Sequence, residues 1–458
     1  DGNFTRSVIW GGRISWLDHR PHGIYCYSWY AGGRLRTGWS GFITGSIQAM
    51  AGLIRNFIGL PDLNGDQGQA SMRNRARFLL VVLLSVAAYA WIGYGVKRHE
   101  SASITVIFLF VSAGYWWLMT SRASSDLWLV FGAAVLMRAV FLFSVPTLSD
   151  DVYRFLWDGW LWHHGHDPFL RTPDEFMAAG IGEPGLYALL GHKDTHTVYP
   201  VIPMGLARMA VLVSDDLIIR IFILRLANLI AEAGTLMLLA RLVRKGAIPA
   251  LSLAAYALNP LVIIELTGNL HHEALVVFFM VASLSFLLNG KDSMAGLMFA
   301  GAVGSKLLPL IFLPGWWSAL GRRRGTKFTV IAVVAAALVL VPQLSGGFFI
   351  GMGSGLGLYF NRFEFNASLW YLIREVGFRI AGFNIIRWAG PLMVATGGML
   401  ILILSIRKKS VSELVSPIML TSLIALGVYL LFATTVHPWY LAPMVLFAVP
   451  AGYRDRKS

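Results

Sequence analysis

Two adjacent carboxylates, Asp150 and Asp151, directly follow an apolar run over residues 126–146. A carboxylate that is partly removed from water and lies beside a like charge has a raised pKa, which suits the abstraction of a proton from a hydroxyl group. The alternative is that both residues cap a helix and carry solvated charges. The pair therefore predicts a general base at a membrane surface, with helix capping as the alternative.

The two aspartates lie at the start of the one long polar insertion in the chain, residues 147–199. This insertion holds eight of the 24 acidic residues and five of the 11 histidines. A loop of this length in a compact membrane protein is usually functional. Three of its histidines, His163, His164 and His166, are close in sequence, but no matching cysteine or His-x-x-His spacing accompanies them. A metal site is therefore not favoured there.

Three basic residues are candidates for holding an anionic group such as a phosphate. Lys306 lies in an apolar stretch, residues 302–313, where an unpaired charge is costly; the alternatives are snorkelling and pairing with an acid. Arg154 lies one helical turn from an acidic residue on either side, so it either forms an ion pair or holds the anion. Arg362 follows a Gly-rich segment, residues 346–357, which predicts a mobile lid.

Three consecutive polar residues, His271, His272 and Glu273, separate two apolar runs. Consecutive side chains on a helix point about 100° apart, so the two histidines do not easily bind one metal ion. Contacts to a sugar or a phosphate are favoured, with structural hydrogen bonding as the alternative. His437 begins the last apolar run and is a candidate for the same site, whereas the Trp and Tyr that follow its Pro neighbour are interpreted as interfacial anchors.

The elements that position these residues are predicted to be membrane spans. Of the 458 residues, 56% are hydrophobic and only 14% are charged, whereas soluble globular proteins carry about 25% charged residues. This composition excludes a soluble enzyme, a disordered protein and a nucleic-acid reader. The formal net charge of +14 comes from basic residues that mostly flank apolar runs, as cytoplasmic anchors do. The single cysteine, Cys26, gives no information on the compartment.

A spanning helix needs roughly 20 mainly apolar residues, and only helices satisfy their own backbone polar groups in lipid. The sequence therefore predicts an all-α polytopic membrane protein with about 10–13 transmembrane helices. The candidate runs are 77–96, 103–120, 126–146, 217–240, 248–267, 273–289, 294–304 with 306–319, 328–345, 384–406, 413–435 and 438–450. Glu232 and Glu265 lie inside such runs, as packed residues or as part of a substrate groove; Glu232 is interpreted as structural.

The distribution of Lys and Arg in short loops orients these spans. The long polar insertion, the loop around His271 and the segment at His437 are assigned to the outside. This arrangement requires residues 200–215 to form a juxtamembrane helix that does not cross, and the chain to turn near Lys306. Lys97 and Arg98, in a loop that this scheme places outside, are an exception to the rule.

The chain is predicted to have two parts. Residues 1–71 are basic and Gly-rich without a spanning run, so they are expected to be a disordered or interfacial extension that is dispensable, with a natural start at Met72. Residues 72–458 are expected to form the transmembrane domain. Within it, residues 147–216 are expected to form an extracytoplasmic catalytic loop that carries juxtamembrane helices.

Several segments together resemble the GT-C superfamily, polytopic glycosyltransferases that use polyprenyl-phosphate-linked sugars. The most specific segments are Ser149-Asp150-Asp151-Val-Tyr153-Arg154-Phe-Leu-Trp157-Asp158-Gly159, His166-Asp-Pro168-Phe and Thr197-Val-Tyr199-Pro200. The segments similar to bacterial mannosyltransferase-like members are Asn259-Pro260, Gly268-Asn-Leu-His271-His272-Glu273, Ser305-Lys306-Leu-Leu-Pro309 and His437-Pro438-Trp439-Tyr440. The resemblance covers roughly residues 126–450.

The resemblance implies that an acidic residue of the first loop is the catalytic base, and the motif does not choose between Asp150 and Asp151. It implies that a single sugar, mannose, moves from a polyprenyl-phosphate donor to a glycan or glycolipid acceptor by one displacement that inverts the anomeric centre. The site is then expected on the extracytoplasmic face of a bacterial inner membrane. Contacts to the donor phosphate or the substrate are expected from Arg154, Tyr199, His271, His272, Glu273, Lys306, Arg362 and His437.

No cofactor is expected to be required. The donor sugar is already activated by phosphate, and the sequence has no Gly-rich phosphate-binding motif. Some metal-using relatives carry an acidic pair in the second loop, where this chain has His271, His272 and Glu273, so a divalent metal is possible but not favoured. The expected partners are the donor, the acceptor and the lipid bilayer, with no nucleic acid.

Two alternatives to a single-sugar transferase remain. One is a transporter or flippase of lipid-linked saccharide, although no duplicated halves are evident. The other is an enzyme that transfers a whole glycan from a polyprenyl diphosphate.

Overall fold

The computed structural model describes residues 66–406 and 414–451, and within these ranges the regular structure is helical apart from an isolated bridge between Phe365 and Thr435. It confirms the all-α polytopic fold class. The chain divides into two compact units, Asp1–Met72 and Arg73–Ser458. The prediction of a disordered or interfacial extension over residues 1–71 falls almost wholly outside the described residues.

Among the described residues, six helices are long and apolar enough to cross a membrane. They are α2 (Asp66–Tyr94), α3 (Ser101–Thr120), α9 (Leu217–Arg244), α14 (Leu313–Leu340), α17 (Ile386–Ile406) and α18 (Val415–Phe432). A seventh candidate combines α10 (Ala250–Ala257) with the helical residues Pro260–Gly268, with a bend of 47° between them.

The other predicted runs form shorter apolar helices, namely α4 (Leu127–Ala139), α12 (Glu273–Leu288), α13 (Asp292–Ser305) and α19 (Ala442–Ala451). An α-helix rises about 1.5 Å per residue, and the hydrocarbon layer of a bilayer is about 30 Å thick. These helices are too short to cross that layer by themselves, which is why the number of full-length spans is lower than the number of apolar runs.

The chain between α12 and α14 folds back on itself, as the distribution of basic residues predicts. α13 ends at Ser305, and Lys306 has extended backbone angles (φ −161°, ψ 141°). The chain then passes through the 3₁₀ turn Leu308–Phe312 into α14. There Arg324 Nη2 lies 2.7 Å from Oδ1 of Asp292, the first residue of α13. Lys306 and Arg324 therefore lie at opposite ends of α13.

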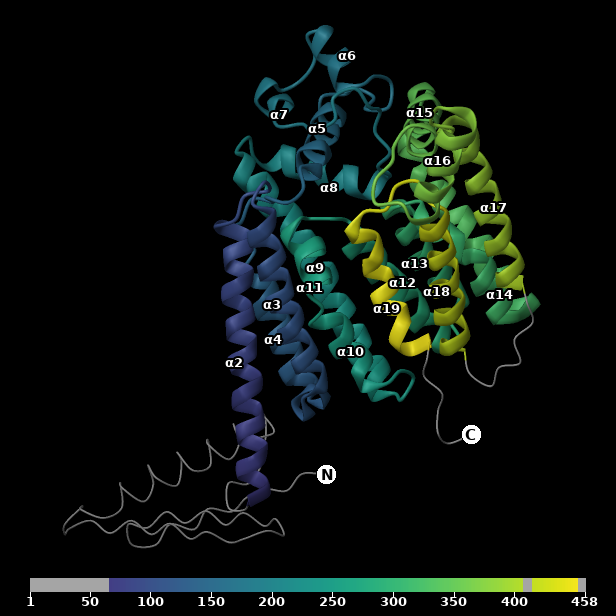
Figure 1. Ribbon diagram of the computed structural model, residues 1–458. Coiled ribbons are helices and arrows are strands. Elements are labelled where there is room, and N and C mark those ends of the chain that lie inside the picture. Colours follow the sequence, from purple (N-terminus) through teal and green to yellow (C-terminus); the bar gives the residue numbers. More distant parts are fainter. Residues whose placement is uncertain (1–65, 407–413, 452–458) are drawn as a thin grey trace, which may run out of the picture. The chain divides into compact units, whose positions relative to one another are not determined.

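The long polar insertion and the segment that follows it fold into four helices at one end of the bundle (Figure 1). They are α5 (Asp151–His163), α6 (Pro173–Ala178), α7 (Pro184–Ala188) and α8 (Val201–Val213). α8 occupies the segment predicted to be juxtamembrane and packs against α5. Gly159 allows this close approach, because a Cβ at that position would lie 2.6 Å from the backbone of Ala207. α15 (Gly346–Asn361) and α16 (Ser368–Ala381) lie at the same end (Figure 1).

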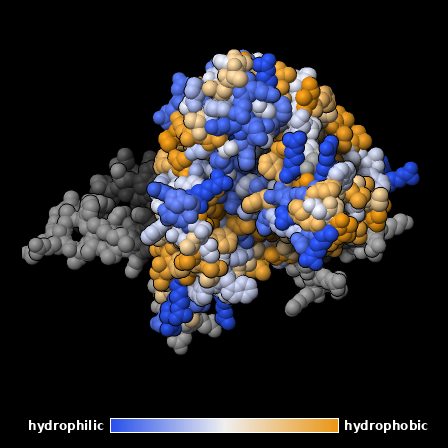
Figure 2. Space-filling model, turned by 45° about the horizontal axis from the view of Figure 1, so that its top comes forward, coloured by the Kyte–Doolittle hydropathy of each residue, from blue (hydrophilic) through white to orange (hydrophobic). Residues whose placement is uncertain are grey.

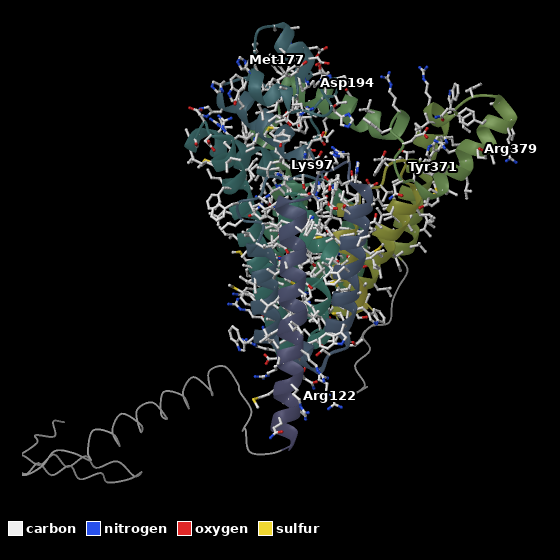
Figure 3. The ribbon with its side chains drawn as sticks, turned by 60° about the vertical axis from the view of Figure 1, so that its left-hand side comes forward. Lys97, Arg122, Met177, Asp194, Tyr371 and Arg379 are labelled. Atoms are coloured by element: carbon white, nitrogen blue, oxygen red, sulfur yellow. The ribbon has the colours of Figure 1, made fainter. Side chains whose placement is uncertain are left out.

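The two ends of the bundle differ in what they carry. Figure 3 shows Met177 and Asp194 of the insertion at one end and Arg122 at the other. Arg98, which with Lys97 is the exception to the charge rule, follows α2 at the end that carries the insertion. Its Nη1 lies 3.3 Å from Oδ1 of Asp150, so this arginine has a carboxylate partner.

The interior of the bundle contains a buried ion pair between α4 and α9. Arg138 Nη2 lies 2.8 Å from Oε2 of Glu232, and both side chains are at most 2% exposed. The hydroxyl of Tyr256 donates to Glu232 over 2.6 Å, and Arg138 also donates to the carbonyl of Ala257 over 2.7 Å. Each charge is thus neutralised and hydrogen-bonded, as a buried ion pair requires. This geometry agrees with the interpretation of Glu232 as structural.

Candidate functional site

The two adjacent aspartates point to different partners. Asp150 occupies the N-cap position of α5, but its side chain caps no backbone amide of the described residues. It pairs with Arg98 instead and packs against Gly191, where a side chain would clash with its carboxylate. Asp151 is the first residue of α5, and its Oδ2 lies 3.5 Å from Nε2 of His271. The helix-cap alternative therefore does not describe Asp150, and Asp151 is the carboxylate that faces the histidine loop.

His271 lies between two carboxylates. Its Nδ1 is 3.1 Å from Oε2 of Glu265, and its other ring nitrogen faces Asp151. The His271 side chain is 2% exposed, whereas that of Asp151 is 30% exposed. Asp151 is therefore open to a substrate on one side while it is held by a buried imidazole on the other.

An irregular stretch of backbone creates this arrangement. Asn259 caps the short helix α11 (Pro260–Val262), which continues into a single π-helical segment, Ile263–Gly268. Leu270 then takes a positive φ of 63°, which a residue with a branched side chain seldom adopts. The π-helical turn brings Glu265 beside His271, six residues later. π-helical turns inside α-helices are frequent at functional sites.

Two buried polar residues of α9 hold this irregular segment in place. Arg225 donates to the carbonyls of Thr267 and Gly268, each over 3.1 Å. Asn228 donates to the carbonyls of Leu266 and His271 over 2.9 and 3.1 Å. Neither Arg225 nor Asn228 was expected from the sequence. The available signal was an Arg and an Asn inside an apolar span, because such residues are costly there unless they have a specific partner.

The last apolar segment completes the site. The ring of Trp439 stacks on His271 with ring centroids 3.6 Å apart, and His437 stacks on Trp439 at 4.4 Å. Trp439 thus lies between two imidazoles, and this contact corrects its interpretation as a simple interfacial anchor. Lys306 contacts the carboxylate of Glu273 and lies 4.3 Å above the ring of Tyr440.

These contacts join residues from five separate stretches of the chain. We call the Asp151 group the set Asp151, Glu265, His271, Glu273, Lys306 and His437. Lys306 has an acidic partner, one of the alternatives expected from the sequence, and it is still 29% exposed, whereas Glu273 is 3% exposed. Of these two residues, an anion from solvent can therefore reach the ammonium group of Lys306 and not the carboxylate of Glu273.

The protonation states of the group follow from its charges. Burial alone would lower the pKa of His271, but Asp151 and Glu265 on its two sides raise it to about 9. Burial would raise the pKa of Asp151, but the contact with His271 and the positive charges of His271 and Lys306 hold it below its usual range. The expectation that a neighbouring like charge raises the pKa of this aspartate is therefore wrong. The cations around Asp151 outweigh Asp150, which turns away towards Arg98.

Two further histidines, His272 beside the group and His437 within it, are neutral. Burial, with the positive charges of His271 and Lys306, lowers the pKa of His272 to about 3. Burial also lowers the pKa of His437 to about 4, although Asp151 opposes the shift. His272 packs against Phe155, and within the described part of the chain neither of its ring nitrogens has a hydrogen-bond partner.

Besides His272, three predicted contact residues lie outside the Asp151 group. Arg154 pairs with Asp158 over 3.0 Å and donates to the carbonyl of Thr195 over 3.0 Å, so the ion-pair alternative describes it. Tyr199 packs edge-on against Phe155, with ring centroids 4.6 Å apart. Arg362 is exposed and lines a separate cavity.

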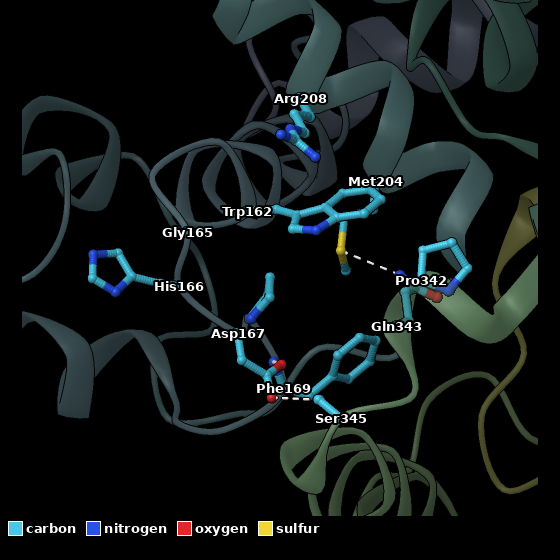
Figure 4. Close-up of a pocket in the computed structure, with 11 residues that line it drawn as sticks. Trp162, Gly165, His166, Asp167, Phe169, Met204, Arg208, Pro342, Gln343 and Ser345 are labelled. Carbon is cyan, nitrogen blue, oxygen red and sulfur yellow. Dashed lines mark hydrogen bonds between the residues drawn. The ribbon is translucent and has the colours of Figure 1, made fainter.

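A further cavity of about 340 Å³ lies between the end of α5, α8 and the start of α15 (Figure 4). His166 and Arg208 line it, and Asp167 accepts a hydrogen bond from Ser345 over 2.5 Å. In the described residues, no group of three or more His, Cys, Asp or Glu side chains is arranged to hold a metal ion. His163, His164 and His166 accordingly form no such group.

The raised pKa of His271 predicts a stability change at alkaline pH. A folded-state pKa above the unfolded value of about 6.5 means that the stabilisation is complete below that value and is lost as the pH rises through about 9. The unfolding temperature of the detergent-purified protein should therefore fall through this window. The variant His271→Gln should lack this alkaline step, and the matched neighbour variant His272→Gln should keep it. An identical alkaline step in all three proteins would contradict the His271 assignment.

The chain is similar to known mannosyltransferases. Residues 71–322 match the model of a family described as alpha-(1→6)-mannopyranosyltransferase, N-terminal domain. Alpha-(1→6)-mannopyranosyltransferase A of Mycobacterium tuberculosis is 28% identical over 291 residues, which cover 61% of this chain and 50% of that protein. The protein of the same name from Corynebacterium glutamicum is 26% identical over 195 residues, covering 42% of this chain and 39% of that protein.

Alpha-(1→6)-mannopyranosyltransferase B of Corynebacterium glutamicum is 26% identical over 240 residues, which cover 47% of this chain and 38% of that protein. The chain thus spans about half or less of the length of the curated relatives it matches. No solved structure matches it. The stretch matched by the family model contains Asp151, His271 and Lys306, whereas Arg362 and His437 lie beyond it.

Proposed function

Because the chain belongs to the alpha-(1→6)-mannopyranosyltransferase family, we propose that it is an integral-membrane enzyme that transfers one mannosyl unit from a polyprenyl-phosphate donor to a glycan or glycolipid acceptor. The observation that carries the proposal is the position of Asp151, which is partly open and is held against His271 at the head of α5. The family membership favours this enzyme over the transporter or flippase and confirms the mannosyltransferase-like resemblance.

Asp151 is the proposed base. It takes the proton of the acceptor hydroxyl while the acceptor oxygen attacks the anomeric carbon, and the bond from that carbon to the phosphate oxygen breaks. The polyprenyl phosphate leaves with the electrons of that bond. Because attack and departure occur on opposite faces, a β-linked donor yields an α-linked product. A carboxylate with a lowered pKa is ionised at neutral pH and is therefore ready to accept the proton.

Glu265 and His271 position this base. When Asp151 becomes protonated, it no longer balances the charge of His271. Glu265, 3.1 Å from the other ring nitrogen, still does. The buried imidazolium therefore keeps a partner throughout the transfer. Lys306 is the proposed contact for the departing phosphate, since it is the exposed cation of the Asp151 group.

The proposed location is a bacterial inner membrane with the site on the extracytoplasmic face. The end of the bundle opposite the site carries Arg324 and Lys245, which pair with Asp292 and Asn289. Basic residues concentrate in cytoplasmic loops. Figure 2 shows hydrophilic residues around a hollow on the face turned forward, with hydrophobic flanks beside it.

Transfer by the purified protein tests the proposal. We expect mannose to pass from synthetic polyprenyl-phosphate mannose, and not from a nucleotide-linked mannose, to an acceptor in a membrane-lipid extract. A β-linked donor should yield an α-linked product, as measured from the coupling constant between the anomeric carbon and its hydrogen. EDTA should leave the rate unchanged, because the proposed mechanism uses no metal. A β-linked product, loss of activity in EDTA, or use of the nucleotide donor alone would each contradict the corresponding step.

A further inference from the structure

A second cavity lies close to the Asp151 group and carries an excess of positive charge. It has a volume of about 760 Å³ and lies between the loop 194–196, the C-terminal half of α15 and the start of α17. Arg362, which follows α15, and Arg387, the second residue of α17, both line it. Its acidic lining residue is Asp194. Two guanidinium groups thus share one cavity with one carboxylate.

The walls of this cavity suit a compact polar ligand. Ser354 offers an exposed hydroxyl, and Gly355 and Gly357 of the same helix lack side chains. Gly355 lets α15 pack closely against the neighbouring loop, because a Cβ there would lie 2.4 Å from the side chain of Val198. The arginine side chains provide planar, multiple N–H donors, an arrangement that matches the oxygens of a phosphate group better than a single ammonium does.

The two cavity arginines differ from their neighbours in pairing. Arg374 and Arg379 of α16 pair with glutamates over 2.7 and 2.9 Å. Among the described residues, neither Arg362 nor Arg387 has a carboxylate within ion-pair distance. Like charges that face one cavity repel each other, and an anion between them relieves this repulsion. Both arginines also lie at the end of the bundle that is proposed to be extracytoplasmic. Basic residues are less frequent in loops on that side of a membrane, so a bound anion would explain the presence of these two.

Contacts connect this cavity to the Asp151 group. Phe365, three residues after Arg362, stacks on His437 with ring centroids 5.1 Å apart. Thr195, another lining residue, accepts a hydrogen bond from Arg154 of α5 through its carbonyl over 3.0 Å. Two segments that carry lining residues thus lead from the cavity towards the proposed reaction site, one to His437 and the other to α5, which begins with Asp151.

The net charge of the Asp151 group favours a further cationic contact in addition to that of Lys306. Asp151, Glu265 and Glu273 carry three negative charges, whereas His271 and Lys306 carry two positive ones. A substrate that bears a phosphate is repelled by a group with net negative charge. Additional cations beside the group offset this repulsion.

We propose that the cavity between α15 and α17 binds the phosphate group of a lipid-linked substrate through Arg362 and Arg387. The proposal rests on the proposed function for the lipid-linked nature of the substrate, but the binding itself does not require transfer. The phosphate belongs either to the donor or to an acceptor glycolipid, and the chemistry of the contact is the same.

Direct binding is the first test. The detergent-purified protein is titrated by isothermal calorimetry with geranylgeranyl phosphate and, as the uncharged control, with geranylgeraniol. The comparison separates recognition of the phosphate from binding of the isoprenoid chain. The double variant Arg362→Gln/Arg387→Gln should bind the phosphate at least about tenfold more weakly and the alcohol as the parent does. Arg379→Gln, which removes an equal charge from a paired arginine (Figure 3), should bind both as the parent does. Phosphate binding that is unchanged in the double variant would overturn the proposal.

Steady-state kinetics then identify the source of the phosphate. A rise in the KM for the polyprenyl-phosphate donor in the double variant assigns the cavity to the donor. A rise confined to a phosphate-bearing acceptor, with a neutral mannoside acceptor unaffected, assigns it to the acceptor. Unchanged KM values for both substrates would overturn the proposal. If the parent protein binds geranylgeranyl phosphate through these arginines but transfers no mannose, the proposed function fails and the phosphate site stands.

Discussion

Replacing Asp151 with asparagine is expected to lower the rate of mannosyl transfer by about 10²–10⁴-fold, the range over which a positioned general base acts. Asparagine has nearly the same shape as aspartate but does not accept the proton of the acceptor hydroxyl. The fold should survive, because His271 keeps its contact with Glu265. The measurement is the initial rate of transfer under saturating donor, together with the unfolding temperature of the variant.

The neighbouring aspartate provides a matched control. Asp150→Asn makes the same chemical change one residue away, where the carboxylate pairs with Arg98, an arginine with 64% of its side chain exposed. Exposed ion pairs contribute about 0–1 kcal/mol, so the rate should change by less than about tenfold. If Asp150→Asn abolishes transfer while Asp151→Asn leaves it intact, the base is Asp150 and the role of His271 must be abandoned.

The adjacent aspartates show what could be predicted from the sequence and what could not. The motif identified both as candidates, but it did not choose between them. The choice depends on the direction in which each side chain leaves the first turn of α5. That direction depends on packing partners distant in sequence, namely Gly191 for Asp150 and His271 for Asp151. A pattern within one segment contains no information on such partners.

The error about the pKa of Asp151 has the same origin. Sequence neighbours suggested repulsion from Asp150, whereas the cations that dominate come from residues more than a hundred positions away. The position of Glu265 beside His271 could not be predicted from the sequence either, because it requires a π-helical turn in the intervening backbone. A regular α-helix would have placed these two side chains differently.

The fold was more accessible to sequence reasoning than the site. Apolar runs and basic loops were enough to predict an all-α bundle, a short helix at the position of α8 and the reversal of the chain at Lys306. The lengths of individual helices were less accessible, because α4 and α13 end within apolar stretches where tertiary packing determines the boundary. Arg98 broke the charge rule for a local reason, since it pairs with the carboxylate of Asp150.

The pair Lys306 and Glu273 gives the second large effect. Lys306→Met is expected to lower transfer by about 10²–10³-fold, the loss seen when one preorganised contact to a developing negative charge is removed. A single variant does not distinguish this role from structural pairing, because it leaves the carboxylate of Glu273, which is 3% exposed, without its partner. An uncompensated buried charge of this kind itself costs about 3–5 kcal/mol.

A double-mutant cycle separates the two roles. Glu273→Gln combined with Lys306→Met removes both charges and so removes the unpaired carboxylate. If Lys306 serves only to neutralise Glu273, the double variant recovers the activity that the lysine variant loses. We expect instead that its stability recovers while its transfer rate stays low, because no ammonium group then faces the departing phosphate. In the double variant, the unfolding temperature should therefore recover while the transfer rate stays low. A lysine with a purely structural role would not give this result.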